Sequence, residues 1–357
     1  MVPRVLMLGW GYPPNVTGGL DTHVGEVFDR MEARDDVEAE LILPAEYAPE
    51  GRESIEGVAT GDGDIITRIG RLSKRFAEKA AEGDFDVVHT HDWFGYGPGS
   101  RAQQSDEDVE WITSFHSLSS DRNVDPPQRE VETEQRVTNR SDYLISVSHL
   151  LADKLKREYG GDSHVVHNGF TEPEFGGRDM KAELEIDGEM LFFVGRHTDQ
   201  KGISHLIYAM KKLRNPDVTL VVGGKGHLTE QLKKFVELLG VEDPVEFVGY
   251  IPEEELGDYY ASADVFVSPS LSEPFGITVT EALAAGTHVV STPAGVIECL
   301  PEDCVVEVEI DSESIAGGIE KGLERAREGP PEYEPRTWDE VVDETIAVYE
   351  KVAAGDY

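Results

Sequence analysis

Short runs of branched aliphatic residues alternate along this chain with longer amphipathic stretches. Six runs occur before residue 170, and a second series of six begins after Gly188. Alternation of strand-length and helix-length segments is typical of βαβ units, in which crossover helices join parallel strands. The pattern predicts an α/β fold with two tandem, doubly wound Rossmann-like domains. Functional residues are then expected just after strands, beside an interdomain cleft.

The boundaries follow from the same pattern. Residues 171–188 are dense in Gly, Pro and charge, which indicates a linker between a first domain (1–170) and a second. Apolar spacing predicts helices at 21–32 and 149–159. The predicted strands are 4–8, 39–43, 86–90, 110–115, 143–147, 164–167, 190–194, 219–223, 245–248, 265–268, 288–291 and 304–308.

Length and charge exclude several functions. The chain has 357 residues, which exceeds one ordinary core and fits two domains. It carries 71 Asp and Glu against 32 Lys and Arg, a formal net charge of −39. A nucleic-acid surface needs an excess of Lys and Arg, and an anionic membrane repels a chain of this charge. Neither partner is expected, although 39% hydrophobic residues suffice for a folded core.

The excess of acidic residues suggests adaptation to a solvent of high salt concentration rather than binding of a partner. Acidic clusters such as Glu253 to Glu255 fall between apolar segments, as expected for a carboxylate surface that binds water and inorganic cations at high salt. A patch for a cationic partner or divalent metals is the alternative. Cys299 and Cys304 form neither a disulfide framework nor a complete zinc site. No signal peptide or transmembrane run is evident, so we expect a cytoplasmic protein.

A glycine pair follows the first predicted strand. Gly18 and Gly19 end a loop that opens into a helix. Glycines let the backbone approach a ligand closely, and the amides of the first helical turn favour an anion such as phosphate. A tight structural turn explains the pair equally well.

Histidines follow the third and fourth predicted strands. His89, His91 and Asp92 end one strand, and His116 ends the next. Polar side chains that converge at strand ends suggest a site. His89 and His91 share a strand face and could bind a metal, but no Cys or Glu cluster completes such a site, so no metal is expected. His91 and Asp92 could equally cap the following helix.

Two cations follow the first strand of the second series. Arg196 and Lys201 lie five residues apart, before an amphipathic helix. An arginine fork and a lysine point charge can together clamp a diphosphate. Their joint placement is informative in a chain this poor in cations. The alternative is that Lys201 only caps or solvates the helix.

Two glutamates flank a later helix start. Glu273 and Glu281 are separated by seven residues, with Gly276 and Ile277 between them. The amides of Gly276 and Ile277 would face an anion, and Glu281, placed about two turns into the helix, could accept from ribose hydroxyls. Two such acids could also serve a hydrolase as general acid and base.

Together these motifs resemble the family 4 glycosyltransferases of the GT-B fold, from residue 4 to about residue 300. The HTHDWF segment is similar to glycogen-synthase-like members. The resemblance implies an enzyme, a hexosyltransferase that moves a sugar from a nucleotide-diphosphate donor to a glycan, lipid-linked or small-molecule acceptor, with retention of anomeric configuration. The motifs are Gly18-Gly19, TSFHS, VHNGF, FVGRHTDQKG, VVGGKG, VEFVGYIP and EPFGITVTEALAAG.

The resemblance also implies roles for individual residues. Domain 171–335 would bind the donor, with Arg196 and Lys201 on the diphosphate and Glu281 on the ribose. His116 would contact the sugar near the reaction centre, so the catalytic set is His116, Arg196, Lys201 and Glu273. The donor set is Gly18, Gly19, Arg196, Lys201, Tyr250, Ile251, Glu273, Gly276, Ile277 and Glu281.

The remaining parts lie on the acceptor side. His91 and Asp92 would face the acceptor in domain 1–170, and residues 336–357 resemble a C-terminal helix that returns to that domain. Loops 47–65 and 95–108 are candidates for acceptor binding. Which acceptor they bind, and whether the donor is UDP-, ADP- or GDP-linked, is not readable from these motifs.

The expected chemistry needs neither metal nor cofactor. Negative charge builds on the leaving phosphate as the anomeric C–O bond lengthens, and cations with helix-terminal amides would stabilise it. The D-x-D strings at 62–64 and 84–86 are interpreted as solvated loops. With no evident covalent nucleophile, a front-face displacement is favoured. A nucleotide-sugar epimerase of the same fold and a non-catalytic nucleotide-sugar binding protein are the alternatives.

Overall fold

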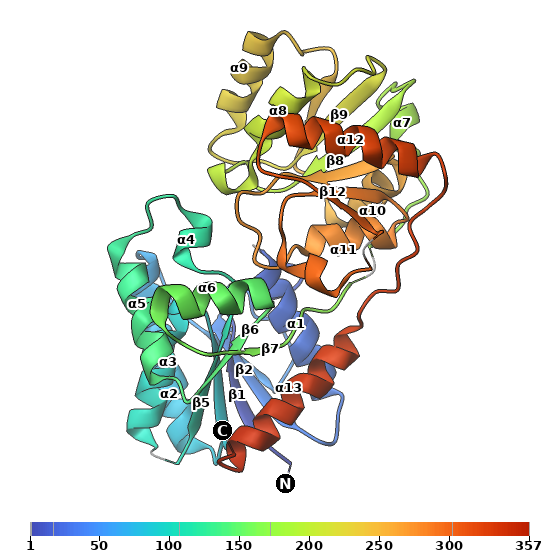
Figure 1. Cartoon of the computed structure of the whole chain (residues 1–357). Coiled ribbons are helices and arrows are strands. Elements are labelled where there is room, and N and C mark those ends of the chain that lie inside the picture. Colours follow the sequence, from blue (N-terminus) through green and yellow to red (C-terminus); the bar gives the residue numbers. More distant parts are fainter. Residues whose placement is uncertain (1, 17, 107, 172, 302, 357) are drawn as a thin grey trace. The chain divides into compact units, whose positions relative to one another are not determined.

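The chain consists of two compact parallel α/β units. The computed structural model describes residues 2–16, 18–106, 108–171, 173–301 and 303–356. Unit 1 comprises Met1–Ser120, Asp125–Gly169 and Arg336–Tyr357, and unit 2 comprises Asp121–Val124 and Phe170–Pro335. Each unit is a parallel sheet with helices on both faces (Figure 1). The predicted fold class, two Rossmann-like sheets, is confirmed.

Unit 1 is built on a seven-stranded sheet of order β3-β2-β1-β4-β5-β6-β7. Its strands are β1 (Arg4–Leu8), β2 (Glu38–Pro44), β3 (Ile55–Val58), β4 (Val87–His91), β5 (Glu110–Phe115), β6 (Tyr143–Ser146) and β7 (His164–Val165). Its helices are α1 (Gly19–Glu32), α2 (Ile65–Glu82), the 3₁₀ turn η1 (Trp93–Gly95), α3 (Tyr96–Ser105), α5 (Gln128–Arg140), α6 (His149–Tyr159) and α13 (Trp338–Ala353), while the short α4 (Ser119–Arg122) spans a unit boundary in the chain.

The two faces of this sheet are covered by different helices. Val5 and Met7 belong to a buried cluster with α1 and α13, whereas Leu6 and Leu8 belong to a second cluster with α2 and α3. Successive side chains of a strand point to opposite faces, so an apolar run such as residues 5–8 of β1 is what a sheet covered on both sides requires.

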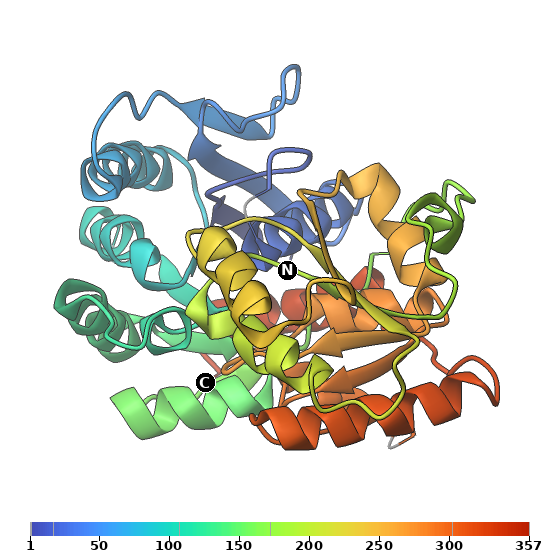
Figure 2. The ribbon, with the colours of Figure 1, turned by 90° about the horizontal axis from the view of Figure 1, so that it is seen from above.

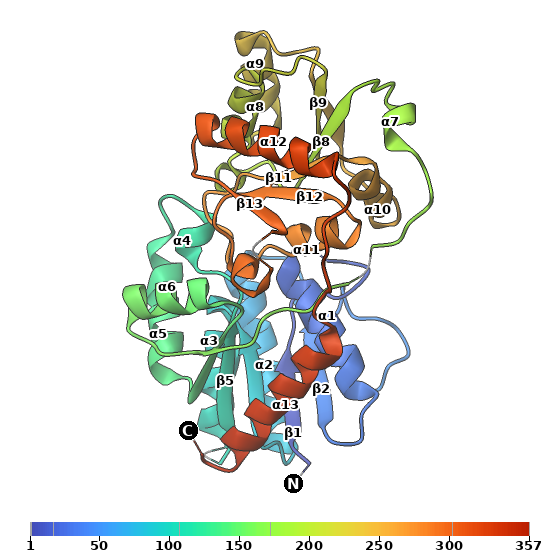
Figure 3. The ribbon, with the colours of Figure 1, turned by 45° about the vertical axis from the view of Figure 1, so that its right-hand side comes forward.

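Helix α13 contributes its apolar face to the core of unit 1. Trp338 is almost fully buried and joins the cluster of β1, β2 and α1. Figure 3 shows α13 lying beside α1. A Cβ built at Gly169 would come within 2.8 Å of Trp338, so a glycine is needed there. The helix begins with a capping box between Thr337 and Glu340.

Unit 2 is built on a six-stranded sheet of order β10-β9-β8-β11-β12-β13. Its strands are β8 (Glu189–Val194), β9 (Val218–Gly223), β10 (Val245–Gly249), β11 (Val265–Ser268), β12 (His288–Ser291) and β13 (Val305–Glu307). Its helices are α7 (Met180–Glu183), η2 (Asp199–Lys201), α8 (Ile203–Met210), α9 (Thr229–Leu239), α10 (Glu253–Ser262), α11 (Ile277–Ala284), η3 (Gly295–Cys299) and α12 (Ser312–Ala326).

One face of this sheet packs against α8, α9 and α12, which Figure 2 shows in the foreground. The other face carries an aromatic group in which Phe192 of β8 contacts Tyr259 and Tyr260 of α10, with ring centroids 5.4 and 5.3 Å away. Phe266 of β11 completes the group. Both faces of β8 and β11 are therefore buried, which holds their carboxyl ends in place.

Two predictions about local structure were wrong. Residues 95–108 do not form a loop, because α3 occupies most of them, and the predicted loop 47–65 contains strand β3. Within α3, Gly99 packs directly on Trp111, where a Cβ would lie 2.0 Å from the indole. No helix in the described residues is both long and apolar enough to cross a membrane.

Candidate functional site

Arg196 and Lys201 follow β8, at the point where the strand order of unit 2 reverses. β8 lies between β9 and β11, so the loops after β8 and β11 flank the topological switch point of the sheet, where ligands of such folds bind. Lys201 ends the 3₁₀ turn η2, and Gly202, with φ 61°, leads into α8. Arg196 is exposed, and no carboxylate lies within 4.0 Å of it in the described part of the chain.

The loops after β8 and β11 are tied together by their backbones. The amide of Leu271 donates to the carbonyl of Gln200 (2.7 Å), and the Gln200 side-chain amide donates to the carbonyl of Ser272 (3.1 Å). A Cβ at Gly202 would lie 2.0 Å from the carbonyl oxygen of Pro269. Only glycine permits this approach, which brings Lys201 beside the loop that carries Glu273.

Lys201 and Glu273 form an ion pair. Lys201 Nζ lies 2.6 Å from Glu273 Oε2, and both side chains are largely buried, with 19% and 12% exposed. The hydroxyl of Ser270 donates to the same carboxylate oxygen (3.2 Å). Gly276, with φ 105°, then turns the chain into α11, whose first amide, that of Ile277, comes four residues after Glu273 in the chain.

Glu281 lies one turn into α11, not two, because that helix begins at Ile277. Tyr260 donates its hydroxyl to Glu281 Oε2 (2.7 Å). Burial raises the pKa of Glu281 to about 7, and the hydrogen bond from Tyr260 opposes that rise. The carboxyl is therefore poised between its neutral and ionised forms at neutral pH.

The two residues predicted to contact the base differ in exposure. Tyr250 follows β10 and is 68% exposed, whereas Ile251 is only 8% exposed. Ile251 packs on β9, where a Cβ at Gly223 would lie 2.6 Å from its Cδ1. Of the two, Tyr250 alone presents its side chain to a ligand.

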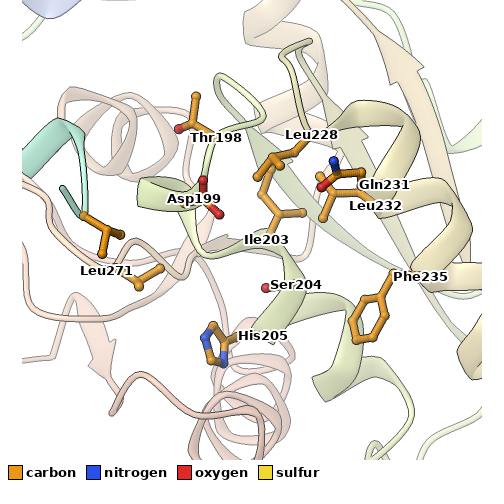
Figure 4. Close-up of a pocket in the computed structure, with 11 residues that line it drawn as sticks. Thr198, Asp199, Ile203, Ser204, His205, Leu228, Gln231, Leu232, Phe235 and Leu271 are labelled. Carbon is orange, nitrogen blue, oxygen red and sulfur yellow. The ribbon is translucent and has the colours of Figure 1, made fainter. Parts of the chain in front are cut away.

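A pocket of about 370 Å³ lies next to the β8–α8 loop (Figure 4). It does not include Arg196, Lys201 or Glu273. Its lining combines apolar side chains with polar ones, among them Asp199, His205 and Gln231. The lining residues are Val124, Thr198, Asp199, Ile203, Ser204, His205, Leu228, Gln231, Leu232, Phe235 and Leu271.

The corresponding switch point of unit 1 lies between β1 and β4. Gly18 and Gly19 end the loop after β1, and both are exposed. Gly18 is the residue before α1, and its carbonyl accepts the amide of Asp21 (3.0 Å). The pair therefore stands at an open helix start, as predicted from the sequence.

His91 and Asp92, predicted to face an acceptor, are buried in unit 1, with 0% and 5% exposed. His91 Nδ1 lies 3.1 Å from His116 Nε2. Asp92 accepts the amides of His116 (2.8 Å) and Ser117 (3.3 Å), and it has a positive φ of 47° that is uncommon for a residue other than glycine. Both residues thus support the segment that carries His116.

A buried glutamate that the sequence analysis missed holds the same segment. Glu134 of α5 is fully buried and accepts the amide (2.7 Å) and the hydroxyl (2.6 Å) of Ser119, and the hydroxyl of Tyr159 (2.6 Å). The sequence does indicate that Glu134 is buried, because it lies three residues before Val137 and therefore on the apolar face of its helix. Carboxylates therefore anchor both ends of residues 116–119.

Four histidines of unit 1 form one cluster: His23, His89, His91 and His116. His23 lies against His116, with ring centroids 4.6 Å apart, and His89 lies 4.6 Å from His91. His89 also contacts Tyr349 Oη (2.7 Å) and Ser114 Oγ (2.8 Å) through its two ring nitrogens. Within the described residues, His91 Nε2 and His116 Nδ1 have no hydrogen-bond partner. Burial lowers the pKa of His23 to about 4 and of His89 to about 3, and those of His91 and His116 well below the usual range.

Comparison with known families assigns both halves of the chain. Residues 17–172 match the family described as glycosyltransferase family 4, and residues 178–330 match the family described as glycosyl transferases group 1. These matches cover the two predicted domains and all the motifs described above except the first strand.

Individual relatives agree with this assignment. An uncharacterised glycosyltransferase of Methanocaldococcus jannaschii is 29% identical, over 97% of each chain. A D-inositol 3-phosphate glycosyltransferase of Xylanimonas cellulosilytica is 31% identical, over 87% of this chain and 85% of its own. Among solved structures, a sucrose-phosphate synthase from Thermosynechococcus elongatus superposes with a TM-score of 0.81 at 20% identity, over 99% of this chain and 100% of its own.

Proposed function

The chain belongs to the group 1 and family 4 glycosyltransferases of the GT-B fold, and on that premise we propose that it transfers a sugar from a nucleotide-diphosphate donor with retention of anomeric configuration. It is an enzyme of the hexosyltransferase class. The acceptor is a glycan, a lipid-linked glycan or a small molecule. Glucose is our first candidate for the transferred sugar.

The observation that carries this proposal is the arrangement at the switch point of unit 2. Lys201 is held by Glu273, while the Arg196 guanidinium is exposed and unpaired in the described residues. A diphosphate placed there meets one free arginine fork, one ammonium that a neighbouring carboxylate orients, and the amides of the α11 start at Gly276 and Ile277. Cations and free helix-start amides are the kinds of group that bind the phosphates of a nucleoside diphosphate, which supports the proposal.

The same groups favour bond breaking. When the anomeric C–O bond lengthens, negative charge grows on the leaving β-phosphate, and the cations stabilise it more strongly than in the ground state. The acceptor oxygen forms the new bond on the same face of the sugar, and its proton passes to the departing phosphate oxygen. Products are the glycoside and the nucleoside diphosphate. We propose that neither a metal ion nor a cofactor takes part.

Glu281 is proposed to bind the ribose. When ionised, its carboxylate can accept from both ribose hydroxyls, and Tyr260 fixes its orientation through the 2.7 Å hydrogen bond. Tyr250 and Ile251 remain our candidates for the nucleobase, with Tyr250 supplying its exposed ring and Ile251 its backbone.

In unit 1, His116 is proposed to act on the donor sugar, and Gly18 and Gly19 to admit a phosphate close to the start of α1. The contacts of His91 and Asp92 support a different role from the acceptor contact that the sequence suggested. His91 orients the His116 ring, and Asp92 holds the His116 backbone. Both are positioning residues.

We also propose that the chain works at high salt, in contact with water and inorganic cations, because its net charge of −39 produces strong self-repulsion in dilute solution. A halophilic, cytoplasmic origin is the corresponding proposal for its source.

The test is a donor and acceptor panel in concentrated KCl. UDP-, GDP- and ADP-sugars are incubated with and without glucan, lipid-linked and small-molecule acceptors, and released nucleoside diphosphate is measured. Release that depends on an acceptor supports transfer, whereas a modified nucleotide-sugar without an acceptor identifies an epimerase. Turnover unchanged in EDTA supports a metal-independent reaction. Loss in EDTA with recovery in manganese contradicts it, and binding without any turnover contradicts catalysis.

A further inference from the structure

Three neighbouring strand-end loops of unit 2 share one backbone network. The amide of Gly224, after β9, donates to the carbonyl of Gly249 at the end of β10 (2.6 Å). The amide of His197, after β8, donates to the carbonyl of Lys225 (3.0 Å). A Cβ at Gly224 would lie 1.9 Å from the carbonyl oxygen of Gly195, so the close contact requires glycine. The loops after β8, β9 and β10 therefore form one continuous surface, the ledge, which comprises residues 195–197, 224–225 and 249–250.

Lys225 stands on this ledge with an exposed side chain. In the described part of the chain its ammonium group has no hydrogen bond or ion pair. Many other lysines here have a carboxylate partner, as Lys156 has Asp162 (2.6 Å) and Lys181 has Asp264 (2.6 Å). An unneutralised lysine at the carboxyl end of a sheet is therefore a specific feature in a chain with net charge −39.

The direction of the Lys225 side chain is indicated by its neighbour. A Cβ built at Gly249 would lie 3.6 Å from Lys225 Cε, so the lysine stem runs along the β10 side of the ledge, next to Tyr250. Arg196 occupies the β8 side. Since β9 lies between β8 and β10, Lys225 stands between the diphosphate cations and the residue proposed for the base.

Adjacent strands are about 4.8 Å apart, so the step from β8 to β10 is about 10 Å, which a nucleoside can span from its phosphate to its base. An ammonium group donates hydrogen bonds and accepts none. Adenine carries an amino group on its ring, and this group donates hydrogen bonds. Uracil and guanine carry a carbonyl oxygen at the equivalent ring position, and this oxygen accepts them.

We infer that Lys225 donates a hydrogen bond to a carbonyl oxygen of the donor nucleobase and so selects uracil or guanine over adenine. This inference rests on the proposed donor site in unit 2. It adds a specificity residue to that site and narrows the donor to UDP- or GDP-linked sugars.

Titration calorimetry of the whole chain in concentrated KCl tests the inference, with UDP, GDP and ADP as ligands. We expect UDP or GDP to bind about tenfold or more tightly than ADP, as one charge-assisted hydrogen bond allows. Lys225→Met keeps the aliphatic stem and removes the donor group, so it should abolish most of that preference while ADP affinity changes less than about twofold. Lys225→Arg should retain a preference. Lys234→Met, at an exposed lysine of α9, is the matched control and should bind as the unmodified protein does.

The other outcomes are equally decisive. If Lys225→Met weakens all three nucleotides by the same factor, the lysine contacts phosphate and the inference is wrong. If the nucleotide preference survives the substitution, or if ADP binds best to the unmodified protein, it is also wrong. If the unmodified protein binds none of the three nucleotides, the donor site itself fails and the inference with it.

Discussion

Lys201 and Glu273 lie 72 residues apart in the chain, and their side chains meet at 2.6 Å in the loops of two neighbouring strands. The ion pair holds the largely buried ammonium group of Lys201 in one direction. An incoming diphosphate then replaces or shares an existing partner rather than ordering a free lysine, so less conformational entropy is lost on binding.

Removing the ammonium group of Lys201 should therefore lower the turnover number more than it lowers the stability of the fold. Lys201→Ala should lower kcat by about 10²- to 10³-fold, as expected when one donor to a developing negative charge is lost. The measurement is steady-state release of nucleoside diphosphate, with Lys234→Ala as the control on the same unit. Near-normal turnover in Lys201→Ala would remove this residue from the mechanism.

His91 should affect catalysis through His116. Because His91 Nδ1 lies 3.1 Å from His116 Nε2, His91→Ala frees the His116 ring to rotate. We expect kcat to fall about tenfold or more while the KM for donor changes little, since a misplaced group costs mainly in the transition state. His91→Asn, which keeps a polar atom near the ring, should recover part of kcat. Equal losses in both variants, with KM raised, would indicate only structural damage.

Nucleotide affinity should depend on pH through Glu281. Its pKa of about 7 leaves the carboxyl largely protonated at pH 6, where one ribose acceptor is lost. The affinity for UDP or GDP should fall as pH decreases from 8 to 6. Glu281→Gln should remove this component of the pH dependence and leave only that of the phosphate. An unchanged pH profile in Glu281→Gln would contradict the assignment.

The histidine cluster should make unit 1 sensitive to acid. The folded pKa values of His23 and His89, about 4 and 3, lie below the ordinary value of 6.5, so the unfolded chain binds more protons as pH falls below about 6.5. The free energy of unfolding is therefore highest above about pH 6.5. As pH falls further, it decreases by up to about 1.4 kcal/mol per pH unit for each histidine. Denaturant unfolding between pH 7 and 5 measures the slope.

Substitution separates this effect from that of the surface carboxylates. His89→Gln should reduce the slope of unfolding free energy against pH relative to the unmodified protein. The raised pKa of Glu281 acts in the opposite direction, because the folded state loses stability as pH rises from about 4.5 through 7 when the pKa of an acid is raised on folding. An identical slope in His89→Gln and in the unmodified protein would show that His89 titrates as it does in the unfolded chain.

Salt should stabilise the chain. At 1 M salt the screening length is about 3 Å, which removes most of the repulsion among the 71 acidic residues. The midpoint of thermal unfolding should rise steadily between about 0.1 and 2 M KCl, where the screening length falls several-fold. Sucrose at matched water activity is the control for preferential exclusion. A midpoint that does not respond to KCl would contradict the proposed high-salt adaptation.

The sequence was most informative where periodicity decides the structure. Strand β1, strand β5 and helix α6 have the predicted bounds, because an apolar run covered on both faces and a Ser148-capped helix leave few alternatives. Strand β3 was missed because its four residues, Ile55–Val58, include a glycine and a glutamate. Edge strands need few apolar residues, so periodicity does not reveal them.

The sequence predicted which residues end the strands near the candidate site, but not where their side chains point. Position after a strand located His91, Asp92 and His116 correctly, yet it could not show that the first two point inward, toward the third. That outcome depends on the turn after β4, where Asp92 adopts a positive φ, and on contacts with a neighbouring strand. The roles of Glu134 and Lys225 depend on tertiary contacts in the same way.

The contribution of α13 to the core of unit 1 has a consequence for biosynthesis. Unit 2 is inserted within unit 1 in chain order, so a ribosome synthesises all of unit 2 before Trp338 is made. The sheet of unit 1 must wait through some 170 residues of synthesis with the surface that α13 covers still open to water. The core of unit 1 can be completed only after unit 2 has been synthesised, when α13 packs onto the sheet.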